Sequence, residues 1–213
     1  MPLLLCMAAF ALFAGKSAWA QPPATQQNIL LLSVDTLRAD RLGCYGYPLN
    51  TSPNLDRFAQ SALLFQDCVC NVPLTNPSMG SMFTSRYPRM NGTTRNGLRL
   101  PEGIPTITEQ FKAAGFYTWC VQSNWTLKRK LSGMHRGFDV YEDDFHEKRW
   151  GFIKPERSAD KVTRVALEQL AKRPKDRPFF AWVHYTDPHA PYKMHKGFNP
   201  SGKKAWTQGR QVP

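Results

Sequence analysis

Short apolar runs alternate with amphipathic stretches along the chain, and this alternation predicts an α/β fold. Three runs indicate strands, and the first and last of them are apolar enough for burial on both faces of a sheet. They are Asn28–Val34, Phe116–Gln122 and Pro178–Tyr185. Helical spacing or helix signals mark Pro53–Ala62, Pro77–Arg86, Thr106–Ala114 and Ser158–Arg173. Strands that alternate with helices predict a mostly parallel sheet with helices on both faces.

Polar residues follow the predicted strands at the places where such a fold binds ligands. In an open α/β sheet, ligands bind beyond the carboxyl ends of the strands. Asp35 and Thr36 follow the first strand, Ser123 and Asn124 follow the second, and the His184–His189 stretch covers the end of the last. A further polar turn, Thr75 to Ser78, leads into a predicted helix. These positions are therefore the candidates for chemistry.

Composition narrows the class of protein without choosing a function. The 213 residues are 42% hydrophobic and 21% charged, which excludes global disorder, collagen and a coiled coil and suits one domain. The formal net charge is +12 at pH 7. This excess suits anionic partners, whether nucleic acid, anionic lipid, or sulfated and phosphorylated substrates.

The first residues resemble an export signal. Leu3–Gly15 is an apolar run of signal-peptide length, too short to span a bilayer, and Ala18–Ala20 fits a cleavage site. We therefore predict a signal peptide over residues 1–20, a linker over 21–27, export to the periplasm or medium, and no transmembrane helix in the mature chain. An uncleaved anchor is the competing interpretation. The mature chain would keep four cysteines, and both disulfides and unpaired thiols are open.

Four segments together resemble the sulfatase family of the alkaline phosphatase superfamily. They are Asn28–Tyr47, Ser52–Arg57, Thr75–Pro88 and Trp182–Tyr192, and their order and spacing agree with that family. The resemblance implies an alkaline-phosphatase-like α/β domain over residues 28–192, followed by a basic polar tail or truncated continuation over 193–213. It also implies metal-dependent hydrolysis of sulfate or phosphate esters, with an anionic ester as the substrate.

The resemblance assigns roles to four residues. Asp35 stands at a metal-ligand position, although a loop carboxylate is the plainer interpretation. Thr75 stands at the nucleophile position and would also contact the metal, with a helix N-cap as the alternative. His189 matches the histidine that contacts the ester oxygen or protonates the leaving group. Asn124 stands where the family has a lysine that contacts substrate, and it can still donate a hydrogen bond.

Several positions depart from the family pattern. Thr36 replaces a second aspartate, and Met79 replaces an arginine beside the nucleophile. Thr75 cannot be converted to formylglycine, because its β-carbon carries a methyl group. Threonine is instead the nucleophile in branches that resemble phosphoethanolamine transferases, lipoteichoic acid synthases and nucleotide pyrophosphatases. The implied cofactor is a divalent cation: calcium for a sulfatase-like enzyme, and zinc or manganese for a phosphotransferase-like one.

The family's downstream Asp-His or Asp-Asn metal ligands have no match after Tyr192. We therefore expect either an N-terminal fragment or a C-terminal half supplied elsewhere, and a catalytically poor isolated chain. Two alternatives to the hydrolase are a phosphoethanolamine- or phosphoglycerol-type phosphotransferase and a non-catalytic fragment that binds anionic ligands. A nucleic-acid partner is not expected, because the chain has no recognisable nucleic-acid-binding motif.

Overall fold

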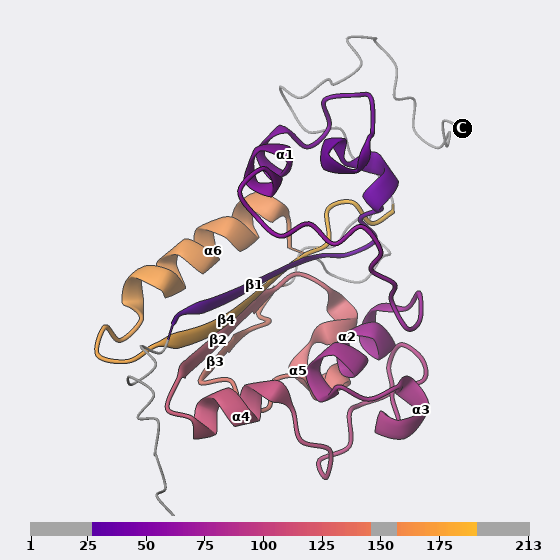
Figure 1. Ribbon diagram of the computed structural model, residues 1–213. Coiled ribbons are helices and arrows are strands. Elements are labelled where there is room, and N and C mark those ends of the chain that lie inside the picture. Colours follow the sequence, from indigo (N-terminus) through magenta and orange to yellow (C-terminus); the bar gives the residue numbers. More distant parts are fainter. Residues whose placement is uncertain (1–26, 146–156, 191–213) are drawn as a thin grey trace, which may run out of the picture.

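The computed structural model describes residues 27–145 and 157–190 (Figure 1). Its strands are β1 (Ile29–Val34), β2 (Tyr117–Gln122), β3 (Val140–Glu142) and β4 (Phe179–Tyr185). Its α-helices are α1 (Pro53–Ala59), α2 (Thr75–Thr84), α3 (Pro88–Asn91), α4 (Ile107–Ala113), α5 (Arg129–Ser132) and α6 (Ala159–Lys172). Three short 3-10 helices are η1 (Ala39–Arg41), η2 (Gly43–Tyr45) and η3 (Trp125–Leu127). The predicted signal peptide, most of the linker and the 193–213 tail lie outside these residues.

The strands form one sheet in the order β1-β4-β2-β3, and every pair is parallel. The register places Ser33 of β1 beside His184 of β4, and His184 beside Gln122 of β2. Because all strands run the same way, their carboxyl ends share one edge. The α/β class with a parallel sheet, predicted from the alternation of apolar runs and helices, is confirmed.

Two apolar clusters pack on opposite faces of the sheet. On one face, Phe83 of α2 and Phe111 of α4 lie against Phe180 and Trp182 of β4. On the other face, α6 packs Val162 against β2 and β4. Figure 1 shows this layering, with α6 on one side of the strands and α2 and α4 on the other. Helices on both faces are what the sequence predicts.

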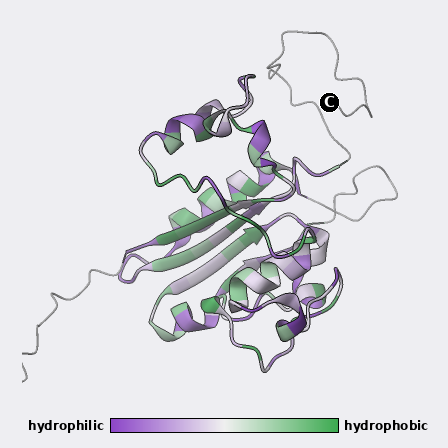
Figure 2. Ribbon diagram, turned by 45° about the vertical axis from the view of Figure 1, so that its right-hand side comes forward, coloured by the Kyte–Doolittle hydropathy of each residue, from purple (hydrophilic) through white to green (hydrophobic). Residues whose placement is uncertain are grey.

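β1 differs from the expectation of burial on both faces. Within the described residues it pairs with β4 alone, and Leu30 and Leu32 are 51% and 57% exposed. Only Leu31 packs against the core, on the α2 side. Figure 2 shows strongly hydrophobic positions along the strands of the sheet, β1 among them. The apolar run correctly predicts a strand, but it does not reveal that α6 leaves the outer strand uncovered.

Local signals set the helix boundaries closely. Thr106 and Glu109 form the predicted capping box at the start of α4: the Glu109 amide donates to Thr106 Oγ1 at 3.2 Å, and the Thr106 amide donates to Glu109 Oε2 at 2.8 Å. The helix predicted over residues 77–86 begins two residues earlier, at Thr75. This shift places the candidate nucleophile on the first turn of α2.

The structure also bears on the two questions that the sequence leaves open about cysteine pairing and a membrane anchor. All four cysteines within the described ranges are unpaired, and Cys120 is fully buried in the core, where burial raises the pKa of its thiol. Across residues 27–145 and 157–190, none of the helices combines the length and apolar character needed to span a membrane.

Candidate active site

Asp35 lies directly after β1, at the carboxyl edge of the sheet. Its amide donates to the Tyr185 carbonyl at 2.8 Å, which continues the β1–β4 pairing by one residue. The next residue, Thr36, has φ 56°, in the left-handed region that a β-branched residue rarely adopts. The chain thus turns sharply away from the sheet after Asp35. This turn leaves the carboxylate at the rim, where two other loops reach it.

Thr75 reaches Asp35 from the start of α2. The Thr75 hydroxyl donates to Asp35 Oδ2 at 3.1 Å, although the two residues are 40 positions apart. The N-cap of α2 is Leu74, so Thr75 does not act as the cap. The turn is anchored by the buried Asn76, whose amide donates to Asn96 Oδ1 at 2.9 Å and whose side chain donates to the Leu98 carbonyl at 2.6 Å. The backbone that carries Thr75 is therefore anchored beside Asp35.

Asn124 is the third side chain of the cluster, and it follows β2. Its Nδ2 donates to the same Asp35 oxygen at 2.6 Å. The orientation of the amide follows from its other end, because Asn124 Oδ1 accepts from the amide and the hydroxyl of Thr126 at 2.9 and 2.8 Å. With Oδ1 taken by two donors, the NH₂ group has to face the carboxylate.

His184 is the fourth member of this cluster; it belongs to the His184–His189 stretch, and its place on a strand predicts a packed core histidine rather than a catalytic one. It is fully buried on β4, and its Nε2 lies 3.7 Å from Asp35 Oδ2, an ion-pair distance rather than a hydrogen bond. Its Nδ1 lies 2.8 Å from Ser33 Oγ. Finding this pair requires the β1–β4 register, which no residue spacing along the chain discloses.

The environment of Asp35 favours its charged form. Burial raises the pKa of this carboxyl, but the nearby His184 ring and the hydrogen bonds from Thr75 and Asn124 lower it by more. The pKa of Asp35 therefore lies below its ordinary value. At neutral pH the rim of the sheet holds a carboxylate whose Oδ2 faces a hydroxyl, an amide and an imidazole.

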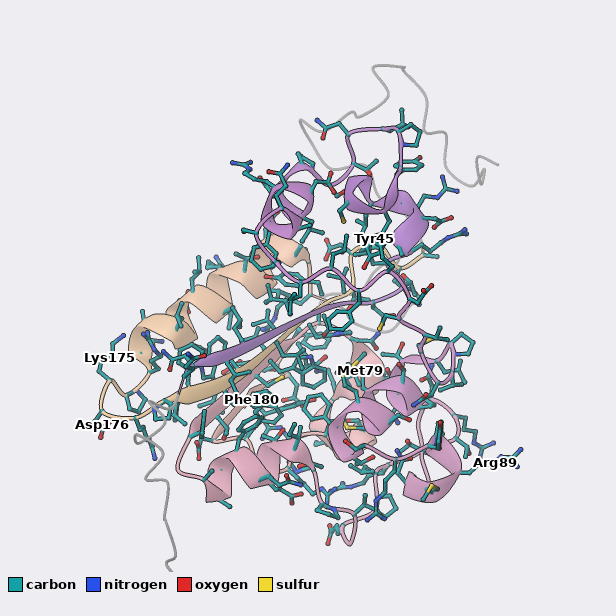
Figure 3. All side chains as sticks on the ribbon, in the orientation of Figure 1. Tyr45, Met79, Arg89, Lys175, Asp176 and Phe180 are labelled. Carbon is teal, nitrogen blue, oxygen red and sulfur yellow. The ribbon has the colours of Figure 1, made fainter. Side chains whose placement is uncertain are left out.

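Other residues predicted to take part lie outside this cluster. In the described part of the chain, His189 has no hydrogen bond or ion pair to Asp35, Thr75 or Asn124; its amide donates to the Thr186 carbonyl at 2.9 Å. Its catalytic role stays a prediction. Met79 packs against the aromatic cluster between α2 and the sheet, where Figure 3 also shows Phe180.

Lys128 and Arg129, which follow Asn124, do not supply a free cation at this rim. The ammonium of Lys128 donates to the Phe145 carbonyl at 2.9 Å, and Arg129 pairs with Asp143 at 3.0 Å. Both positively charged groups therefore bind the segment that follows β3. The charge lost where Asn124 replaces the family's lysine is not restored by these two side chains.

Asp35 and Thr75 fit part of a divalent-cation site. A carboxylate and a hydroxyl oxygen are hard ligands, and two oxygens 3.1 Å apart can both contact one cation. Across residues 27–145 and 157–190, however, no group of three or more His, Cys, Asp and Glu side chains gathers as a metal site would. The described residues therefore provide a partial ligand set.

The fold is alkaline-phosphatase-like, as its similarity to solved structures of that class shows. Within that class, the chain belongs to the sulfatase family, whose model, described as Sulfatase, matches residues 27–211. It is similar to an N-acetylglucosamine-6-O-sulfatase of Bacteroides thetaiotaomicron, with 29% identity over 88% of this chain and 35% of that protein. It is also similar to human arylsulfatase A, with 39% identity over 57% of this chain and 25% of that protein.

Solved structures show the same fold. A protein in complex with its substrate D-glucosamine-2-N,6-O-disulfate superposes with a TM-score of 0.65 at 24% identity, over 77% of this chain and 35% of that one. A phosphonate monoester hydrolase of Agrobacterium radiobacter gives 0.63 at 20% identity, over 81% of this chain and 43% of that one. The chain thus spans about a third of the length of several proteins that it matches.

Proposed function

We propose that this chain carries the nucleophile half of a metal-dependent sulfatase-like hydrolase of sulfate or phosphate esters. The observation that supports this most is the distance of 3.1 Å between Thr75 Oγ1 and Asp35 Oδ2, at the edge of the sheet where this fold class binds ligands. Membership of the sulfatase family and the sulfated substrate of one structural neighbour support an anionic ester as the substrate.

In this proposal Thr75 attacks the sulfur or phosphorus atom of the ester. Asp35 Oδ2 accepts the hydrogen of the Thr75 hydroxyl and so aims a lone pair of the oxygen away from the carboxylate. The Thr75 oxygen forms the bond to the sulfur or phosphorus atom as its proton passes through Asp35 Oδ2 to solvent, and the bond from that atom to the ester oxygen breaks, so that the ester oxygen leaves with the substrate alcohol. Water then releases the acid group from Thr75. Asn124 keeps Oδ2 in place from the other side and has a second amide hydrogen for an ester oxygen.

Asp35 and Thr75 would hold the divalent cation, together with ligands from a C-terminal half supplied elsewhere. When bound, the cation supplies positive charge that polarises the ester and favours ionisation of a nearby hydroxyl. Calcium fits an all-oxygen site of this kind, and zinc or manganese would fit a phosphotransferase-like one. His189 is proposed as the proton donor for the leaving alcohol.

The test compares Thr75→Ala with Thr84→Ala, a threonine at the other end of α2. Thr84 Oγ1 donates to the Gly80 carbonyl and does not contact Asp35. With 4-nitrophenyl sulfate, 4-nitrophenyl phosphate and added calcium, zinc or manganese, T75A should lose turnover by about 10³-fold or more, and T84A should keep most of it. Equal turnover in wild type and T75A would remove Thr75 from the mechanism. No turnover by the wild-type chain would instead favour non-catalytic binding of anions.

A phosphoethanolamine- or phosphoglycerol-type phosphotransferase is the second candidate, favoured by the threonine at position 75. It predicts that phosphodiesters and phosphomonoesters react faster than sulfate esters, and that zinc or manganese supports the reaction better than calcium. The ratio of kcat/KM for 4-nitrophenyl phosphate and 4-nitrophenyl sulfate decides between the two candidates.

We also infer that the protein acts outside the cytoplasm, in the periplasm or the medium. The support is the sequence of residues 1–20, with its apolar run and Ala18–Ala20 cleavage pattern. Expression of the full chain followed by N-terminal sequencing of the periplasmic fraction should give a mature protein that begins at Gln21. Retention of Met1 in a cytoplasmic fraction would contradict export.

A further inference from the structure

A chain of hydrogen bonds behind the active-site carboxylate starts at Trp182. The Trp182 indole nitrogen donates to Ser33 Oγ at 2.8 Å, and Ser33 Oγ lies 2.8 Å from His184 Nδ1. An indole N–H is a donor and never an acceptor, so Ser33 Oγ accepts this bond. The hydroxyl hydrogen of Ser33 is then free to point at His184.

This arrangement favours one tautomer of His184. The described structure gives the Ser33 hydroxyl hydrogen one acceptor, His184 Nδ1 at 2.8 Å, and if Nδ1 accepts it, the proton of the neutral ring sits on Nε2. His184 Nε2 is buried and has no hydrogen-bond partner within the described residues, and Asp35 Oδ2 lies 3.7 Å from it. The N–H of His184 therefore faces the oxygen that Thr75 and Asn124 also contact.

A competing partner for His184 would have to come from the neighbouring strand. Gln122 holds the matching register position on β2, and it is fully buried. In the part of the chain that the structure describes, neither atom of its amide forms a hydrogen bond, so it does not bind the His184 ring. The carboxylate of Asp35 is thus the polar group that faces the buried N–H of His184.

We propose that His184 is a positioning residue for Asp35, and that Trp182 and Ser33 set its tautomer. Trp182 orients Ser33, Ser33 keeps Nδ1 free of a proton, and Nε2–H faces Asp35 Oδ2 across 3.7 Å from inside the core. It attracts the carboxylate from that side, while Thr75 and Asn124 bind it by hydrogen bonds from the rim. The proposal rests on the proposed function only in giving Asp35 a part in catalysis. The tautomer and the contact are tested without turnover.

Nitrogen NMR on the full chain labelled with ¹⁵N-histidine tests the tautomer. The His184 signals are assigned by their loss in His184→Gln. In the neutral ring we expect a protonated Nε2 and an unprotonated Nδ1. Trp182→Phe should shift the Nδ1 signal, because Ser33 loses its donor. Trp119→Phe is the matched control, since Trp119 is buried as deeply but its indole N–H has no hydrogen-bond partner in the described structure. A protonated Nδ1 in the wild type would overturn the proposal.

The contact between His184 and Asp35 is tested by replacing His184 with two amide side chains of different length. His184→Gln can place an amide donor near the position of Nε2, whereas His184→Asn keeps a polar group only near Nδ1. The side-chain amide signals of Asn124 report on the shared carboxylate. They should stay at the wild-type position in H184Q and move in H184N, provided circular dichroism shows both variants folded. Should one variant fail to fold, Ser33→Ala, which frees Nδ1, replaces it and should move the same signals. If the Asn124 amide signals keep the wild-type position in all of these variants, the contact between His184 and Asp35 is refuted.

Discussion

Asn124 and Asp35 are 89 residues apart in the chain, yet Asn124 Nδ2 lies 2.6 Å from Asp35 Oδ2. The pair joins the loop after β2 to the loop after β1, across the intervening strand β4. Thr126 holds the far end of the Asn124 amide, so the donor cannot turn away from the carboxylate without losing two hydrogen bonds.

Asn124→Asp should destabilise the protein in the absence of divalent cations. The new carboxylate keeps the oxygen that binds Thr126 but places a second negative charge against Asp35, which we expect to cost about 1–3 kcal/mol. Added calcium should restore part of the loss if this rim binds cations. Thermal unfolding with and without calcium measures both effects. The exposed Asn54→Asp is the control, and an equal response in both variants would contradict the prediction.

Asp139 should make stability depend on pH in the acid range. Burial raises the pKa of its carboxyl, but the ion pair with Lys112 at 2.8 Å and hydrogen bonds from Thr118 lower it below the ordinary 3.8. A lowered pKa in the folded state stabilises the protein above pH 3.8, and this contribution is lost as the pH falls below that value.

Asp139→Asn should remove that contribution. Urea unfolding from about pH 6 to about pH 3 should show a shallower fall in stability for D139N than for wild type. Glu168→Gln, on the exposed face of α6, should leave the slope unchanged. A slope for D139N as steep as that of the wild type would assign the acid sensitivity to other carboxylates.

Thr36→Asn should stabilise the fold. Thr36 has φ 56°, and this left-handed conformation is more strained for a β-branched residue than for asparagine. We therefore expect the free energy of unfolding to rise by about 1 kcal/mol. Chemical denaturation measures the gain. Thr94→Asn is the control, because Thr94 is exposed and is not among the residues with positive φ. A loss of stability in T36N would show that the threonine side chain itself holds the turn after Asp35.

Gly137→Ala should be among the most damaging single changes in the chain. A Cβ there would lie 2.4 Å from the Glu109 amide nitrogen, and φ is 79°, so backbone clash and strain add to about 3 kcal/mol or more. Gly103→Ala is the control, since a Cβ at that position meets no atom within 4 Å. Midpoints of thermal unfolding compare the two, and equal midpoints would contradict the close approach of the two loops.

The sequence predicts local structure and the rim of the sheet better than it predicts contacts across strands. The Thr106–Glu109 capping box follows from spacing alone, because both bonds lie within one helical turn. Asp35 and Asn124 could be placed together because carboxyl ends of parallel strands share an edge, and the family resemblance adds Thr75 to them. The Ser33–His184 pair could not, because it depends on a register between residues 151 positions apart.

The sequence also did not predict how deeply individual apolar side chains are buried. The leucines of β1 have the composition of a central strand, and only the strand order shows that they lie on an outer one. The sequence likewise does not show what Met79 contacts. The structure packs Met79 against the aromatic cluster, which explains why a long apolar side chain is tolerated one helical turn after Thr75. Both depend on which helix covers which strand.

Within residues 27–145 and 157–190 the outer edge of β1 is uncovered, and this has a consequence for handling the protein. Its outer backbone groups and the leucines at positions 30 and 32 present a template on which another extended chain can pair. The net charge of +12 opposes such self-association at low ionic strength, and salt screens that repulsion. Concentrated stocks in high-salt buffer should therefore form β-rich aggregates, while dilute, low-salt solutions stay clear.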